Sequence, residues 1–122
     1  MELDSLSPTQ IQEFLSHLLQ KAKLKAETIA KMDEMYNLST SSNCEILYLF
    51  LRLGLKSEWE ESFSLTMNFL KSMGRLKYTR PLYRDLIKWP NRKNAVVDFF
   101  NENKHLLMAS VVDGVKKDLN IS

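Results

Sequence analysis

Residues 42–54 read SNCEILYLFLRLG, and the segment 46–53 within them is apolar at every position except Arg52. A helix over this segment would be apolar on nearly every side, which is typical of a helix that is buried among other helices. The stretch therefore predicts a central helix and, with it, a helical core.

Both ends of this stretch carry helix boundary signals. Ser42 and Glu45 have the spacing of a capping box, in which each side chain accepts a hydrogen bond from a free backbone N–H at the helix start. Gly54 suits the left-handed residue that commonly follows the last turn of a helix. The central helix is therefore expected to end at about Leu53.

The same helical spacing of apolar residues continues on both sides of the central helix. Ser7, Pro8 and Gln10 form a start signal, with a capping serine, a proline at the first helical position and a glutamine that completes a capping box. Ser57 with Glu60 repeats the box pattern, and Trp89 before a proline marks a helix end. The expected helices cover about residues 8–20, 26–36, 43–53, 58–73, 81–88, 92–104 and 106–119.

About seven helices in antiparallel pairs, joined by short turns, predict an all-α fold of the right-handed α-α superhelix type, as in HEAT and armadillo repeats. A compact irregular bundle is the alternative. The pairs share no sequence repeat beyond their apolar spacing, and no strand is needed. With 122 residues, of which 44% are hydrophobic, the chain fits one domain spanning 1–122.

Composition narrows the function classes. The formal net charge of +2 is too small to demand a nucleic-acid partner. Glu2 and Asp4 stand where a signal peptide would be basic and then apolar, and no segment reaches the length of a membrane span. Cys44 has no second cysteine to pair with and is expected to be a structural thiol. These features predict a soluble cytoplasmic protein that does not bind a membrane.

Catalytic and metal-binding patterns are missing from the sequence. The two histidines, His17 and His105, lack a partner at ligand spacing, so no metal site is expected. No serine lies in a G-x-S-x-G motif, and Glu58, Glu60 and Glu61 fit the first turn of a helix, where negative charge complements the helix dipole. We therefore assign no catalytic residue on this chain.

The charge is unevenly distributed along the sequence. Residues 71–93 contain eight Lys or Arg and a single acid, Asp85, whereas residues 27–61 contain seven acids and three basic residues. Within the basic stretch, residues 74–86 read GRLKYTRPLYRDL. Such a concentration of cations beside a glycine and a proline indicates a corner that receives an anion, although a solvated basic surface is the alternative.

Arg75 and Lys77 are the candidate anion-binding residues. Gly74 is expected to end one helix and Pro81 to begin the next, which leaves both cations in a non-helical link. Side chains two residues apart in an extended segment point the same way, so the two cations would converge on one carboxylate or phosphate.

The sequence resembles the C-terminal helical domain of leukotriene A4 hydrolase and its aminopeptidase B and aminopeptidase O relatives. The most specific part is the string from Gly74 to Tyr83, GRLKYTRPLY. The similarity covers almost the whole chain and is carried further by Ser5-Leu6-Ser7, Gln10, Glu13-Phe14-Leu15, Met35-Tyr36-Asn37, Glu45-Ile46, Leu51-Arg52-Leu53, Trp59-Glu60, Asp85-Leu86 and Lys117-Asp118-Leu119.

The resemblance implies a parent zinc aminopeptidase, in which an N-terminal β domain and a thermolysin-like domain precede the helical domain. The H-E-x-x-H zinc motif of that catalytic domain is missing here, so the isolated chain is expected to be inactive. Zinc would be the cofactor of the parent enzyme, and the other two domains and short peptides would be the partners of this chain. By the same resemblance, Arg75 and Lys77 hold the substrate carboxylate.

Three further interpretations of the function remain open at this point. The segment 88–93 is more basic than expected of leukotriene A4 hydrolase, which favours a peptide-only relative over one that hydrolyses a lipid epoxide. The alternative function is a basic helical-repeat module that binds an acidic protein or nucleic acid, with an affinity that falls steeply as salt rises. A scaffold for protein partners would require an exposed apolar groove.

Overall fold

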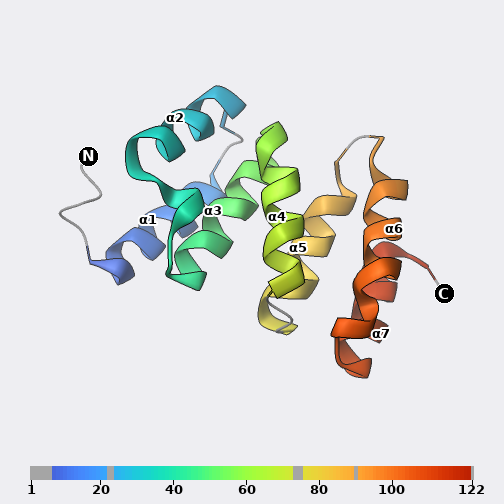
Figure 1. Cartoon of the computed structure of the whole chain (residues 1–122). Coiled ribbons are helices and arrows are strands. Elements are labelled where there is room, and N and C mark those ends of the chain that lie inside the picture. The colour runs from blue at the N-terminus through green and yellow to red at the C-terminus, as the bar shows by residue number, and fades with distance from the viewer. Residues whose placement is uncertain (1–6, 22–23, 73–75, 90, 122) are drawn as a thin grey trace. The chain divides into compact units, whose positions relative to one another are not determined.

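The computed structural model describes residues 7–21, 24–72, 76–89 and 91–121, except for the side chains of Leu76 and Lys77. These residues form seven α-helices and two short 3-10 helices, and none of them lies in a strand, which confirms the all-α class (Figure 1). The elements are α1 (Pro8–Gln20), α2 (Ala26–Tyr36), η2 (Leu38–Thr40), α3 (Cys44–Lys56), α4 (Glu60–Ser72), α5 (Leu76–Ile87), α6 (Lys93–Asn103), η3 (Lys104–Leu106) and α7 (Ala109–Leu119).

The chain divides into two compact units, residues 1–62 and 63–122. In the first unit α1 and α2 pack against α3, and in the second α6 and α7 pack against α5. Packing therefore joins helices two apart in chain order, α1 with α3 and α5 with α7, as well as neighbours. The single domain over 1–122 stays a prediction.

Helix α3 is the centre of the first unit, as its apolar run predicted. Its buried residues cover most of the helix surface, and they are Ile46, Tyr48, Phe50, Leu51, Leu53, Gly54 and Leu55. Leu15 of α1 and Ile29 of α2 are fully buried as well. Met35, which was expected in this core, is 68% exposed, so that prediction is wrong. Of the α2 residues expected in this core, only Ile29 is buried, and Met32 and Tyr36 are half-buried.

The N-terminal caps agree with the sequence at α1 and differ by one residue at α3. The Ser7 hydroxyl accepts from Gln10 N at 3.2 Å, and the Gln10 side chain accepts from Ser7 N at 2.9 Å, as a capping box requires. At α3 the cap is Asn43, whose Oδ1 accepts from Glu45 N and Ile46 N. Ser42 is therefore not the cap, since an asparagine one residue later satisfies the same donors equally well.

Gly54 does not end α3 in the left-handed conformation, which corrects the predicted boundary. The helix continues to Lys56, Ser57 is its C-cap, and Glu58 takes the positive φ of 55°. Ser57 consequently cannot open α4, which begins at Glu60. The reason for a glycine here is close approach, because a Cβ at Gly54 would lie 2.7 Å from Ser62 Cβ and 3.2 Å from Trp59 Cε3.

Gly54→Ala is expected to destabilise the protein by about 1–3 kcal/mol, because the added methyl group overpacks the contact with Ser62. This loss would exceed the gain of about 1 kcal/mol that alanine brings to an exposed helix. Urea unfolding measures the difference. Ser64→Ala on exposed α4 surface serves as the control and should be nearly neutral. A Gly54→Ala variant that is more stable than the wild type would contradict the overpacking argument.

The second unit is built around aromatic side chains. Tyr83 of α5 lies edge to face against Phe100 of α6 at 5.7 Å between ring centroids, and Phe69 of α4 contacts Tyr78 in the same way. Fully buried aliphatic residues complete this core, namely Leu82, Leu86, Val96 and Val115. Ala95, expected on the inner side of α6, is exposed, because the buried stripe of α6 runs through Val96, Phe99 and Phe100.

Helix α5 starts five residues earlier than the sequence predicted. It begins at Leu76, and Pro81 lies inside it. Pro81 cannot donate to the carbonyl of Lys77, which is the usual reason to place a helix boundary there. The helix nevertheless extends through this position because it buries Tyr78 and Thr79 together with Leu82.

The remaining boundaries lie close to the predicted ones. Helix α5 ends at Ile87, before Trp89 and the following proline, as expected. Helix α7 begins at Ala109 instead of residue 106, because Lys104–Leu106 form the 3-10 helix η3.

Candidate functional site

Of the two predicted anion-binding residues, the structure places only the backbone of Lys77. Arg75 falls outside the described residues, and Lys77 is the second residue of the helix. The expected non-helical link is therefore wrong at Lys77, because α5 already begins at Leu76. Because Lys77 is helical, extended geometry does not make the two cations converge, and their assignment as a pair depends on the family resemblance.

The structure accounts for the other two cations of residues 74–86. Arg80 binds the carboxylate of Asp118 on α7 through two hydrogen bonds, which it donates from Nε to Oδ2 at 2.9 Å and from Nη2 to Oδ1 at 3.0 Å. Arg84, one turn later, donates from Nε to Oδ1 at 2.9 Å. Both arginines thus bind one acid of the chain itself, so two of the four cations in residues 74–86 have a structural partner.

Asp118 is the buried partner in this network, with 8% of its side chain exposed against 31% for Arg80 and 50% for Arg84. Burial acts to raise the pKa of Asp118, but the hydrogen bonds and charges of the two arginines outweigh it and hold this pKa below its usual value. The hydrogen bond to Asp118 raises the pKa of Arg80 in turn. Asp118 and Arg80 are therefore charged at neutral pH.

Aromatic faces hold two more cations of the basic stretch. The guanidinium of Arg92 lies 4.7 Å from the ring centroid of Phe63 and 5.2 Å from that of Trp89. Lys71 Nζ lies 6.0 Å from the ring centroid of Phe99. Contacts of this kind are cation–π interactions. Trp89 is a buried neighbour of Phe63 and Arg92.

Sequence reasoning missed Asp118 as a structural residue of the site. A signal for it exists, because Asp118 follows the apolar positions Val111 and Val115 at helical spacing and adjoins the buried Leu119. A carboxylate at the edge of a buried stripe requires a cationic partner. The sequence cannot name that partner, since Arg80 is 38 residues away.

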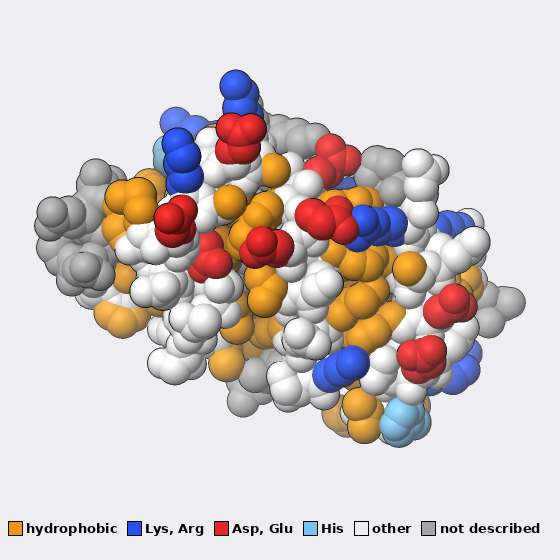
Figure 2. All heavy atoms as spheres, turned by 45° about the horizontal axis from the view of Figure 1, so that its top comes forward, with side chains coloured by type: hydrophobic (Ala, Val, Ile, Leu, Met, Phe, Trp, Pro, Cys, Tyr) orange, Lys and Arg blue, Asp and Glu red, His pale blue; other side chains and the backbone are white. Residues whose placement is uncertain are grey.

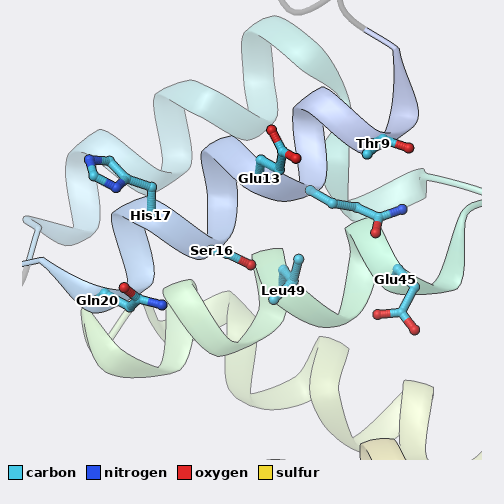
Figure 3. Close-up of a pocket in the computed structure, with 8 residues that line it drawn as sticks. Thr9, Glu13, Ser16, His17, Gln20, Glu45 and Leu49 are labelled. Atoms are coloured by element: carbon cyan, nitrogen blue, oxygen red, sulfur yellow. The ribbon is translucent and has the colours of Figure 1, made fainter.

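An open groove between α1 and α3 lies in the other unit. It has a volume of about 420 Å³, and Figure 3 shows Ser16 and Leu49 pointing toward one another across it, with His17 and Glu45 at opposite ends. His17 is exposed, as its surface position on the helix predicted. The polar groups around this groove do not converge on one point, so we assign no binding or catalytic function to it.

Among the described residues, no three His, Cys, Asp or Glu side chains gather where they could hold a metal ion. His17 and His105 lie in different units, and the sequence contains no H-E-x-x-H motif. No step of the function proposed below is therefore assigned to a metal on this chain.

Surface charge and helix length bear on the remaining interpretations. On the face shown in Figure 2, acidic and basic side chains are interspersed, with hydrophobic side chains exposed between them. That mixture differs from the continuous basic surface that a nucleic-acid interface presents. Within the part of the chain that the structure describes, every helix is too short or too polar to cross a bilayer.

Known proteins share both the sequence and the fold. The family description "Leukotriene A4 hydrolase, C-terminal" matches residues 6–119. Leukotriene A-4 hydrolase of Xenopus laevis is 35% identical over 99% of this chain, and leucine aminopeptidase 2 of Aspergillus terreus is 36% identical over 97% of it. The chain spans about a fifth of their length, 20% and 19% respectively.

The solved structure of native yeast LTA4 hydrolase shares the fold, with a TM-score of 0.84 at 21% identity over 98% of this chain and 21% of that one. The yeast enzyme in complex with Bestatin has the same TM-score at 22% identity. Because the family match covers nearly the whole chain and the fold agrees, this protein belongs to the leukotriene A4 hydrolase C-terminal domain family.

Proposed function

We propose that this chain is the noncatalytic C-terminal domain of a zinc metallo-aminopeptidase, in which it lines the active-site cleft and anchors the substrate C-terminal carboxylate through Arg75 and Lys77. The observation that carries the proposal is the family match over residues 6–119, whose most specific string contains both cations. The parent enzyme removes N-terminal residues from peptides, and zinc in its catalytic domain supplies the Lewis acid for hydrolysis.

The ion pairs of α5 support the choice of Arg75 and Lys77 within that string. Arg80 and Arg84 bind Asp118, so they serve the packing of α5 on α7. Lys77 lies in the first turn of α5, where the helix dipole also favours an anion, and Arg75 precedes it by two residues in the sequence. An arginine offers a planar fork to a carboxylate, and a lysine adds a compact point charge.

A clamp of this kind connects a noncatalytic domain to catalysis. When the far end of a short peptide is held by its carboxylate, the binding energy positions the scissile bond at the reaction centre of another domain. The domain would therefore select peptides by length and by a free C-terminus. The isolated chain would have no peptidase activity, and a reducing cytoplasmic compartment suits its single Cys44.

The test is aminopeptidase turnover by the full-length enzyme on a tripeptide and on the same tripeptide with an amidated C-terminus. We expect the wild type to prefer the free carboxylate by about 10²- to 10⁴-fold in kcat/KM, because each of the two clamp residues contributes about 1.5–3 kcal/mol through a hydrogen bond to a charged group. Arg75→Ala should lower this preference by about 10- to 100-fold by slowing turnover of the free acid alone.

Lys88→Ala is the matched control, since it deletes one exposed cation from the same basic stretch. It should keep the preference of the wild type. Equal handling of both peptides by the wild-type enzyme would refute the clamp and would return the basic corner to a solvated surface or a module for an acidic partner.

A further inference from the structure

The contact between α5 and α7 has an ionic part that its apolar packing does not require. Leu82 and Leu86 of α5 are fully buried, as are Val111 and Val115 of α7 to within 2%. A buried ion pair adds little net stability compared with apolar packing, but its fixed geometry can select one arrangement of the packed elements. The bidentate contact of Arg80 with Asp118 therefore points to a role in position more than in stability.

Gly114 strengthens this interpretation. It lies one turn before Asp118 on α7, and a Cβ at this position would be 2.7 Å from Arg80 Nε and 2.8 Å from Arg80 Cδ. A glycine inside a helix costs about 1 kcal/mol relative to alanine. Glycine is needed here because the guanidinium of Arg80 lies directly against the α7 backbone. Gly114 and Asp118 of α7 thus both contact the Arg80 side chain of α5.

The contact of Arg80 with Asp118 lies close to the start of α5. Lys77 precedes Arg80 by three residues, about one turn of the same helix, and Arg75 precedes it by five in the sequence. A rigid bidentate pair one turn away limits how far the first turn of α5 can shift or rotate on α7. Small displacements matter here, because an error of about 1 Å in substrate position can lower a rate about 100-fold.

We propose that Asp118, together with Gly114, acts as a positioning residue for the carboxylate clamp, because it holds Arg80 and Arg84 and so sets the first turn of α5. Asp118 also binds both Arg80 and Arg84 and offsets one of their two positive charges, which draws them away from the substrate carboxylate. This inference depends on the proposed function and adds the residues of α7 to it.

The experiment compares Asp118→Asn with wild type in the full-length enzyme, on the tripeptide and its amidated analogue. Asparagine keeps the size of the side chain and removes the charge that binds the two arginines. We expect the preference for the free carboxylate to fall by about 10- to 100-fold, with turnover of the amide changed less than about threefold. Asp113→Asn, an exposed acid on the same helix, is the matched control and should behave as wild type.

Gly114→Ala provides a second variant that keeps the charge of Asp118. The new methyl group meets the end of the Arg80 side chain, so it should displace the guanidinium while α7 itself gains helix propensity. We expect a loss of preference in the same direction as for Asp118→Asn. If Asp118→Asn does not fold, Gly114→Ala decides the question alone.

A combined variant separates positioning from a general structural effect. In a background with Arg75→Ala and Lys77→Ala together, Asp118→Asn should cause no further loss of the free-carboxylate preference, because both clamp residues are already removed. The inference is overturned if both α7 variants keep the preference, or if they slow both substrates equally. Retention of the preference by Arg75→Ala would instead refute the proposed clamp itself.

Discussion

Replacing Arg75 and Lys77 together by alanine is expected to lower kcat/KM of the full-length enzyme for a free-carboxylate tripeptide by about 10²- to 10⁴-fold. Each charged hydrogen bond contributes about 1.5–3 kcal/mol, so two contacts to one carboxylate amount to about 3–6 kcal/mol. Because both cations would bind the same group, the effects of the single variants need not add. Steady-state kinetics of the two single variants and the double variant measure this coupling.

The amidated tripeptide is the control substrate for the double variant. It lacks the charge that the clamp binds, so its kcat/KM should change less than about threefold, and unfolding of the double variant should match that of the wild type. A comparable loss with the amide would mean that Arg75 and Lys77 support the domain's structure and not the substrate carboxylate. Lys88→Ala with Lys93→Ala, two exposed cations, gives a control of equal charge change.

Phe100→Ala is expected to destabilise the protein by about 3–5 kcal/mol, the largest effect that we expect from a single substitution on stability. Phe100 has no exposed surface, and its ring lies edge to face against Tyr83 at 5.7 Å between centroids. Its removal leaves a cavity where α5 and α6 pack, and aromatic pairs of this geometry add about 0.5–1.5 kcal/mol beyond their buried area. Urea unfolding followed by circular dichroism measures the loss.

Trp89 offers a local probe of the same unfolding transition. It is buried in the second unit beside Phe63, so its fluorescence in a Trp59→Phe background reports on residues 63–122. The Phe100→Ala midpoint should move to lower urea in this signal. Met108→Ala, at a side chain that is 73% exposed, should change stability by less than about 0.5 kcal/mol. A loss below about 1 kcal/mol for Phe100→Ala would show that the ring is not an essential part of this core.

Local sequence patterns were sufficient to predict those features whose determining residues all lie within one short segment. The capping box at Ser7, the helix over Ala26–Tyr36 and the burial of Phe50 follow from hydrogen-bonding spacing and from apolar periodicity. The helix end predicted at Gly54 was wrong because the role of this glycine depends on a residue of another helix. A glycine can permit positive φ or close approach, and only the position of Ser62 distinguishes the two.

The same division applies to the candidate site. The sequence by itself determined the all-α class, the family and the basic string from Gly74 to Tyr83, because these depend on residue order and spacing. Only the tertiary structure decided that α5 continues through Pro81 and that Arg80 and Arg84 bind Asp118. Burial and ion pairing join residues 34 to 38 positions apart, and the energy of such contacts exists only once the chain has folded.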